Sequence, residues 1–481
     1  MENNFFARLE NYTNSKYFAW VVAAIFFSAG LALIFIANGT CDDGDSIMHY
    51  QFARWAVVHH ELFFDHWAKP FYVLVASPFA QFGIPGIKIF NLLVSSITVV
   101  ITYNIASNLN IKHKGLVAVM MVMAPGLITH SLSGLTEPLF ALVLSVSILL
   151  YLRNYIWHAL VVVSFLPFVR SEGLIICGVF AFMLIIEKQW KLLPLLLLGH
   201  VVYSFAGYPI HGKLLWVFTR IPYAHLSSVY GKGPWSHFFV ALLNLIGVPL
   251  YVFLVAGLLA GIFNVVKSGM SKIVLRKWIL VYGCFLAYFT AHVIFWKFGI
   301  FNSFGLVRVL VAVLPIMAIL QLEGLNAFAD LFKTSLLQRW VLNVFTLAII
   351  AFPFIPFNSS WHYQHDFCLN VSQLSDKQAT DYIKENFKDY KKAQYYYDAN
   401  YISILMDIDY FDTTTSRRVW EAYEHPPRGE AFLLWDNWYS AVDYKMGYDV
   451  PANNPRFKLV KKCTLYDKWK YEKTTALFTT N

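Results

Sequence analysis

The apolar run YFAWVVAAIFFSAGLALIFI, residues 17–36, is followed closely by CDDGDSIMHYQFARW, residues 41–55. The first stretch predicts a membrane-spanning helix, because a span needs about 20 consecutive apolar residues. The second stretch then places Asp42, Asp43 and Asp45 at the edge of the membrane. Carboxylates held this close together disfavour each other's ionised form, so at least one of them is a candidate proton acceptor.

The residues after these acids predict a short amphipathic helix that lies in the membrane interface. Apolar residues recur at helical spacing from Ile47 to Val58, with His49 and Arg54 on the polar side. Acids that are merely solvated are the alternative interpretation of the loop. The presence of Asp65, His66 and Lys69 further along the same loop favours a site instead.

The composition predicts a polytopic membrane protein. Of the 481 residues, 58% are hydrophobic and only 14% are charged, against about 25% charged in an average soluble domain. The formal charge of +9 does not indicate nucleic acid, because basic residues in short cytoplasmic loops give the same total. The sequence shows neither an internal repeat nor a low-complexity segment.

The apolar runs predict about eleven transmembrane helices, some of them short enough to be tilted or broken. These lie at residues 17–38, 71–83 with 86–107, 116–132, 136–153, 155–170, 173–187, 192–208, 238–265, 278–296, 306–324 and 340–356. The distribution of Lys and Arg between alternate loops places the N-terminus in the cytoplasm. An odd number of spans then puts the polar tail, residues 357–481, outside the cytoplasm.

The polar tail reads as a small extracytoplasmic α/β domain. Helix patterns at 375–388 and 399–407 alternate with strand patterns at 394–397, 431–435 and 457–463. We therefore expect two domains: a transmembrane domain over 1–356, with a catalytic outer loop at 39–70, and a soluble domain over 357–481. Cys368 and Cys463 bracket the tail and are able to pair in an oxidising compartment.

Four further features fall on the predicted outer face. Glu137 follows a tight turn and precedes a proline; it either reaches a polar site or simply starts a helix. Arg170 and Glu172 lie between two apolar runs, and form either part of a phosphate site or an ion pair among lipid headgroups. Arg220 lies in a loop of aromatic and basic residues, which suits an anionic lipid and a sugar but is also typical of an interfacial loop. Arg308 lies at the outer start of a span, where it either snorkels to the surface or binds a substrate phosphate.

Other catalytic signatures are missing from the sequence. It contains no Walker A loop, no HExxH, no dinucleotide fingerprint and no paired CxxC. The early histidines do not fall into a metal-ligand spacing. The clustered acids are able to hold a divalent cation, but nothing in their spacing indicates one, so we predict neither a metal site nor a firm cofactor.

The first outer loop resembles that of the GT-C membrane glycosyltransferases. Asp45-Ser46-Ile47-Met48-His49-Tyr50 with Ala53-Arg54, followed by Lys69-Pro70, is similar to the acid, Tyr, Ala-Arg and Lys-Pro pattern of the aminoarabinose transferases. These families use a polyprenyl-phosphate sugar donor and carry a catalytic acid in this loop. The resemblance departs from the family at the catalytic point, where the usual adjacent acidic pair is spread over 42–45.

Three further segments extend the resemblance. Phe64-Asp65-His66 resembles the loop of the protein O-mannosyltransferases. Thr136-Glu137-x-Leu-Phe and Arg170-Ser171-x-Gly173 are similar to segments of the GPI mannosyltransferases. The layout matches over roughly residues 17–310.

The resemblance implies an inverting transfer of a mannose-like hexose on the extracytoplasmic face. Arg308, Arg170 and Lys69 would hold the donor phosphate, while Asp45, or else Asp43 or Asp42, would take the proton of an acceptor hydroxyl. His49, Arg54, Asp65, His66, Glu137, Glu172 and Arg220 are the other expected substrate-binding residues. The acceptor is a glycan, a lipid or a protein, and membrane lipids surround the chain, which we place in the bacterial inner membrane.

A non-enzymatic membrane protein is the alternative. A transporter or flippase should carry ionisable residues near the midplane of its spans and often shows internal repeats. A scaffold subunit derived from a transferase, with a tail that binds a partner, would have the same sequence pattern as the enzyme.

Overall fold

The computed structural model describes residues 12–268, 271–427 and 429–480. Its contacts divide the chain into two compact units. The first, here called the membrane unit, comprises Met1–Ile36 and Phe63–His362; the second, the tail unit, comprises Ala37–Leu62 and Tyr363–Asn481. The expected loop 39–70 is therefore divided between the units: residues 39–62 belong to the tail unit and residues 63–70 to the membrane unit. The N-terminal residues 1–11, predicted to be cytoplasmic, lie outside the described part.

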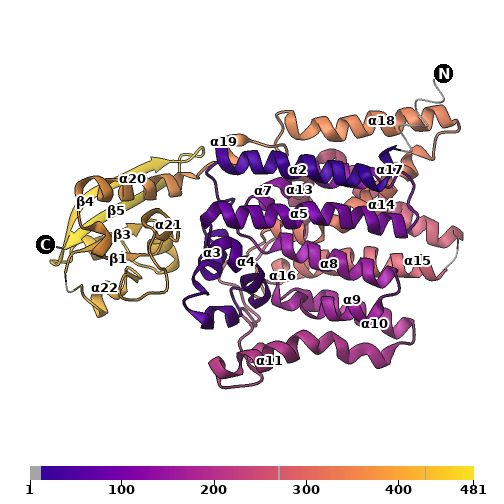
Figure 1. Ribbon diagram of the computed structural model, residues 1–481. Helices are drawn as coiled ribbons and strands as arrows, with labels where there is room; N and C mark the ends of the chain where they lie inside the picture. Colours follow the sequence, from indigo (N-terminus) through magenta and orange to yellow (C-terminus); the bar gives the residue numbers. More distant parts are fainter. Residues whose placement is uncertain (1–11, 269–270, 428, 481) are drawn as a thin grey trace. The chain divides into compact units, whose positions relative to one another are not determined.

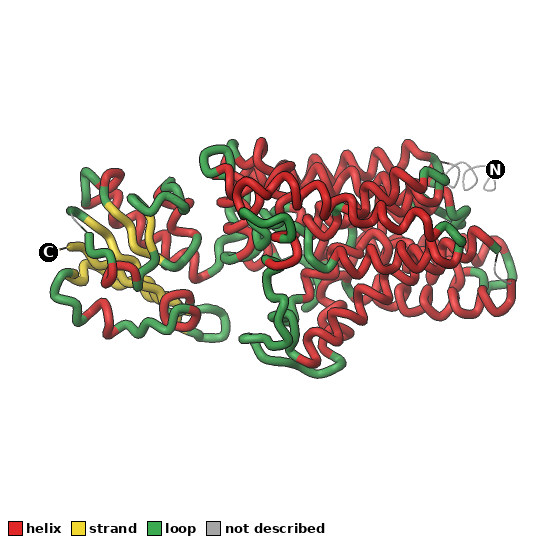
Figure 2. Tube along the Cα trace, turned by 90° about the horizontal axis from the view of Figure 1, so that it is seen from below, coloured by secondary structure: helices red, strands yellow, loops and turns green. Residues whose placement is uncertain are grey.

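The membrane unit is a bundle of apolar helices, seen side by side in Figures 1 and 2. Six helical segments of the described chain are long and apolar enough to cross a membrane: α2 (Lys16–Ile36), α5 (Gly83–Asn108), η3 with α11 (Trp190–His211), α15 to α16 (Lys272–Phe298), η5 with α17 (Val307–Ala329) and α18 with η6 (Ser335–Phe354). The fold is thus that of a multi-pass helical membrane protein, as predicted. The number of eleven spans stays a prediction.

The unit also contains other apolar helices, most of which are shorter. They are α4 (Pro70–Ala80), α6 (Leu116–Val122), α7 (Pro125–Ser131), α8 (Glu137–Leu152), α9 (Ile156–Ser164), α10 (Gly173–Ile186), α13 (His237–Ile246) and α14 (Val248–Ser268). Pro125 divides the predicted span 116–132 into α6 and α7, because proline lacks the N–H that would continue a helix and is favoured at the first helical position.

The segment η5 with α17 (Val307–Ala329) forms the centre of the bundle, and nearly all of its most apolar stretch is buried. It packs closely on α14, where Gly257 of one helix faces Gly324 of the other. A Cβ atom at either glycine would collide with a backbone carbonyl of the facing helix. Small residues at such crossings let two membrane helices approach closely.

Loops predicted to share one side of the membrane do contact each other. On the predicted cytoplasmic side, Arg276 Nε lies 2.7 Å from Glu187 Oε1, Lys277 Nζ lies 2.6 Å from Glu323 Oε1, and Lys112 Nζ lies 3.0 Å from Asp330 Oδ2. Residues predicted for the opposite side gather in a second group, described below. Which of the two groups faces the cytoplasm stays a prediction from the basic residues.

The tail unit is built on a five-stranded mixed sheet of order β2-β1-β3-β5-β4. Its strands are β1 (Gln394–Tyr397), β2 (Ser416–Arg417), β3 (Ala431–Asp436), β4 (Phe457–Tyr466) and β5 (Glu472–Thr480). Strand β1 pairs in parallel with β2 and β3, whereas β5 pairs antiparallel with β3 and β4. The predicted α/β character of the tail matches this arrangement, although β2 and β5 were not among the predicted strands.

Both faces of this sheet are buried, as the alternation of its apolar side chains requires. Tyr395, Phe432 and Leu477 point to one face, and Tyr396, Leu433 and Phe478 to the other. The helices of the unit are α3 (Asp45–Trp55), α20 (Val371–Asn386), α21 (Tyr401–Met406) and shorter turns. Cys368 and Cys463 are free thiols, so the pairing that the sequence allows in an oxidising compartment is not formed.

Candidate active site

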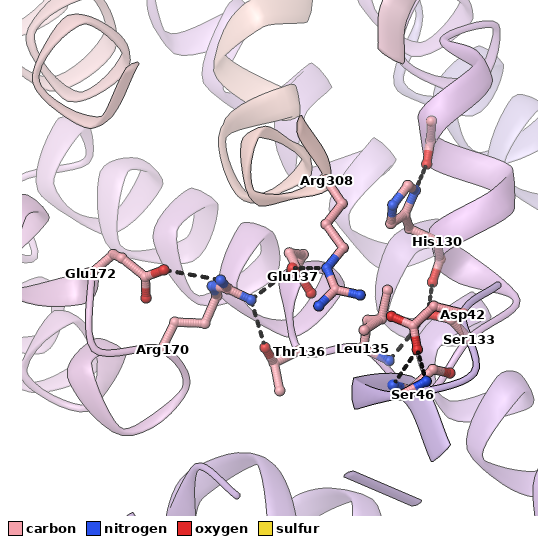
Figure 3. A network of polar contacts seen from close by, with 12 residues as sticks. Asp42, Ser46, His130, Ser133, Leu135, Thr136, Glu137, Arg170, Glu172 and Arg308 are labelled. Carbon is pink, nitrogen blue, oxygen red and sulfur yellow. Dashed lines mark hydrogen bonds and ion pairs between the residues drawn. The ribbon is translucent and has the colours of Figure 1, made fainter. Parts of the chain in front are cut away.

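A buried cluster of charged residues lies in the membrane unit (Figure 3). Arg170 is at its centre: Nη1 lies 2.7 Å from Glu137 Oε1, and Nη2 lies 2.9 Å from Glu172 Oε1. The Thr136 hydroxyl accepts a further hydrogen bond from Arg170 Nη1 at 3.1 Å. Arg308 approaches Glu137 Oε1 through its Nε atom, at 3.8 Å. The predicted residues Glu137, Arg170, Glu172 and Arg308 are therefore brought together.

Local sequence explains how each of these side chains reaches the cluster. Glu137 begins α8 and is followed by Pro138 at a favoured helix-start position. Arg170 and Glu172 lie in the tight turn between η2 (Leu166–Phe168) and α10. Arg308 is the second residue of the 3-10 helix η5 (Val307–Val313). The start of α8, the turn between η2 and α10 and the start of η5 thus bring their charged side chains into one cluster.

Burial makes the ion pairs of this cluster strong. The Glu137 side chain is fully buried and the side chains of Arg170 and Arg308 are 14% and 15% exposed. A lone buried carboxylate would be costly, so the position of Glu137 depends on its arginine partners. Burial alone would raise the pKa of Glu172, but the neighbouring Arg170 outweighs it and lowers that pKa to about 2.

Two polar residues of α16 (Cys284–Phe298) extend the cluster, and the sequence prediction missed both. Tyr288 lies within electrostatic reach of Arg170, and His292 within that of Glu172. Their rings are 4.7 Å apart, one helical turn from each other. Within the described chain, Tyr288 Oη and His292 Nε2 have no hydrogen-bond partner although both are buried. Their spacing of four residues inside an apolar run is a signal that a search for buried polar pairs would find.

Lys69 joins the same region from the start of α4. Its Nζ donates to Ser171 Oγ at 3.2 Å, and Ser171 stands between Arg170 and Glu172. The backbone of Lys69 has a φ of +69° just before Pro70, a conformation that is unusual for a residue other than glycine. Such strained residues concentrate at functional sites.

Asp65 and His66 mainly shape the segment that precedes Lys69. Asp65 Oδ1 accepts the backbone N–H of Ala68 at 2.8 Å, and His66 Nε2 lies 3.0 Å from the Val217 carbonyl. Because a carbonyl oxygen can only accept, Nε2 of His66 carries the proton. Burial lowers the pKa of His66, and nearby Lys69 lowers it further, so this imidazole is neutral at pH 7.

The three acids of the first loop lie in the tail unit and have different local roles. Asp42 Oδ1 accepts the backbone N–H groups of Gly44 and Ser46, at 3.1 and 2.8 Å (Figure 3). Asp42 lies two residues before Gly44, the N-cap of α3, and its carboxylate bonds the first turn of the helix as an N-cap side chain would. Asp43 Oδ2 accepts a hydrogen bond from Asn370 Nδ2 at 3.0 Å. Asp45 is the first residue of α3 and is partly exposed.

Helix α3 packs against the rest of the tail unit instead of presenting a polar face to solvent. Ile47 lies in a small core with Leu369 and Tyr401, and His49 is 5% exposed. Arg54 Nη2 lies 2.7 Å from Asp407 Oδ1. The predicted helix is present, but its expected polar side is largely covered by the tail unit.

Arg220 directly follows the short helix α12 (Trp216–Thr219) as its C-cap residue, and it is exposed. A role of this residue in substrate binding stays a prediction. Over residues 12–268, 271–427 and 429–480, no group of three or more His, Cys, Asp and Glu side chains is arranged to hold a metal ion.

No family model and no curated protein matches the chain. Among solved structures, the chain is similar to the crystal structure of ArnT from Cupriavidus metallidurans bound to undecaprenyl phosphate. The two are 11% identical, with a TM-score of 0.61 over 94% of this chain and 97% of that one. The chain therefore has the ArnT fold over almost its whole length. The relation to the aminoarabinose transferases that the first loop predicted is confirmed at the level of the fold.

Proposed function

We propose that the chain is an inverting glycosyltransferase that moves a sugar, most simply a mannose-like hexose, from a polyprenyl-phosphate donor to an acceptor hydroxyl on the extracytoplasmic face. The buried cluster of Glu137, Arg170, Glu172 and Arg308 carries this proposal. Charged groups inside a bundle of apolar helices are costly even when they pair with one another, and they commonly mark a substrate or ion pathway. The ArnT neighbour was crystallised with undecaprenyl phosphate, a ligand whose phosphate suits such a site.

The reaction needs charge neutralisation more than acid catalysis. The acceptor oxygen attacks the anomeric carbon and loses its proton to a carboxylate, for which we propose Asp45. The bond between the anomeric carbon and the phosphate oxygen breaks, and its electron pair stays on the phosphate, which gains one negative charge. Because the polyprenyl phosphate is already a good leaving group, positioning and electrostatic stabilisation dominate.

We assign the cationic part of the site to Lys69 and Arg308. Arg170 has a different role in this proposal: it holds Glu137 and Glu172 in place through both terminal nitrogens. His66, kept neutral by burial, orders the segment before Lys69. Asp45 is proposed as the base because its place in the first loop resembles that of the catalytic acid of the GT-C families, whereas Asp42 Oδ1 accepts two backbone N–H groups at the start of α3.

The test is transfer of radiolabelled sugar from polyprenyl-phosphate donors in membranes that contain the wild-type chain or Asp45→Asn at matched expression. We expect transfer by the wild type and a loss of about 10²- to 10⁴-fold in the variant, the usual contribution of a general base. A parallel series with EDTA decides metal dependence. If no donor supports transfer by the wild type, the proposal fails; removal of a co-purifying partner by deletion of residues 363–481 would then indicate a scaffold subunit.

A further inference from the structure

The tail unit contains the first-loop acids as well as the C-terminal domain. The segments Ala37–Leu62 and Tyr363–Asn481 form one compact unit. Backbone contacts start this association: the N–H of Gly39 donates to the Phe367 carbonyl at 2.8 Å. A Cβ at residue 39 would collide with the backbone at Phe367 and Cys368, so only glycine permits this approach.

The N-terminal turn of α20 carries an unusual version of a common helix cap. Asn370 Oδ1 accepts the N–H of Gln373 at 2.9 Å, and Gln373 Oε1 accepts the N–H of Asn370 at 3.1 Å. This reciprocal pair is a capping box, which Ser or Thr with Glu forms equally well. Helix capping alone therefore needs only the side-chain oxygens of Asn370 and Gln373.

The amide nitrogens of the same two residues are used on the acidic loop. Asn370 Nδ2 donates to Asp43 Oδ2 at 3.0 Å, and Gln373 Nε2 donates to Thr40 Oγ1 at 2.7 Å. The Thr40 hydroxyl in turn donates to the Asp42 carbonyl at 2.5 Å. One helix start thus fixes residues 40, 42 and 43, and it does so with the donors that a Ser–Glu box lacks.

We propose that Asn370 and Gln373 are positioning residues for sugar transfer: the start of α20 holds the loop at residues 40–43, and with it the carboxylates of the active site, in the geometry that the reaction needs. This inference rests on the proposed glycosyltransferase function and gives the C-terminal domain a role in it. Two further contacts attach residues 37–62 to the C-terminal part of the tail unit. Gln51 Nε2 donates to Ser403 Oγ at 2.7 Å, and His59 Nε2 lies 2.8 Å from Asp409 Oδ2.

The test replaces both amides without removing the helix cap. Asn370→Ser with Gln373→Glu keeps a standard capping box but lacks the two N–H donors to the loop. Asn386→Ser is the matched control, because Asn386 is exposed at the other end of α20 and donates within its own helix, to the Tyr382 carbonyl. Full-length proteins in detergent are compared by hydrogen–deuterium exchange of residues 38–47 and by steady-state sugar transfer.

We expect faster exchange of residues 38–47 in the double variant and a kcat lower by about 10- to 100-fold, since a misplacement of about 1 Å has this cost. The KM for the donor should change by less than about twofold. Exchange in the rest of the tail unit should match the wild type, because a smaller folded fraction would also lower the apparent kcat. Unchanged exchange, or exchange that rises with an unchanged kcat, would overturn the inference. If the wild type transfers no sugar, the proposed function fails, whereas faster exchange in the double variant would still support the role of α20 in ordering the loop.

Discussion

Replacing Asp42 by Asn should preserve most of the sugar transfer that replacing Asp45 by Asn abolishes. Asp42 Oδ1 accepts two backbone N–H groups, of Gly44 at 3.1 Å and of Ser46 at 2.8 Å. The amide oxygen of Asn makes the same two bonds and is an equally good cap. The negative charge at the helix start is worth about 0.3–1 kcal/mol. If capping is the main role of Asp42, Asp42→Asn should therefore lose at most about fivefold in rate.

Asp42→Ala separates capping from charge. It removes both hydrogen bonds, and the loss of a helix cap costs roughly 0.5–2 kcal/mol. Transfer should then fall between the values for Asp42→Asn and Asp45→Asn. Asp45→Asn itself should lose about 10²- to 10⁴-fold if Asp45 is the base. The rate of transfer should therefore fall in the order Asp42→Asn, Asp42→Ala, Asp45→Asn. The first two losses follow from helix capping, and the third, much larger loss follows from removal of the base.

The assay is initial-rate transfer from a polyprenyl-phosphate donor, with the amount of each variant in the membrane quantified by immunoblot. Hydrogen exchange of residues 45–55 reports whether α3 still starts at its usual position. The reasoning is refuted if Asp42→Asn is as inactive as Asp45→Asn while α3 remains protected, because Asp42 would then act chemically and not as a cap.

Two further predictions concern stability. Arg170→Ala should destabilise the membrane unit by about 3–5 kcal/mol, because it leaves the fully buried Glu137 without its nearest cation; Glu137→Gln combined with Arg170→Gln should cost less than the sum of the single changes, as measured by SDS-induced unfolding, and additive costs would contradict the pairing. In the tail unit, burial raises the pKa values of Asp376, Asp398 and Asp436, the last to about 6. A raised pKa means that the folded state binds the proton more tightly, so the contribution of these three groups to stability is fully present below about pH 4 and is lost as the pH rises through 6; Asp436 alone accounts for about 3 kcal/mol. Thermal unfolding of the full-length protein should show this loss between about pH 4 and 6, and Asp436→Asn should reduce it; an equal pH dependence in that variant would argue against the assignment.

Local sequence patterns predict the parts of this fold that depend on local physics. The apolar runs coincide with helices, because backbone groups in a bilayer have no other partner, and the break at Pro125 follows from its missing N–H. Charged residues beside those runs also indicate the buried cluster. Glu137 and Arg170 are costly to bury separately, so they are expected to form an ion pair. Tyr288 and His292 were missed because a single Tyr or His in an apolar helix is common in protein cores.

Contacts between distant segments are what the sequence does not reveal. Asn370 and Asp43 are separated by 327 positions, and no periodicity connects them. The sequence pattern predicted a helix at 375–388, whereas α20 begins at Val371 with Asn370 as its N-cap. The second use of the Asn370 and Gln373 amides depends on which loop lies beside them. The division of the first loop between two units has the same cause. Residues 37–62 contact residues of the C-terminal tail, whereas the residues from Phe63 onward contact the helices of the membrane unit.

Arg170 illustrates why a residue type alone does not establish a role. Its planar guanidinium suits a phosphate through two parallel hydrogen bonds, which is the role that the sequence suggests. In the structure Nη1 already contacts Glu137 and Thr136, and Nη2 contacts Glu172. A donor phosphate bound there would have to displace a buried carboxylate and leave it without its nearest cation, a cost of several kcal/mol. We therefore propose that Lys69 and Arg308 hold the phosphate, and that Arg170 holds Glu137 and Glu172 in place beside it.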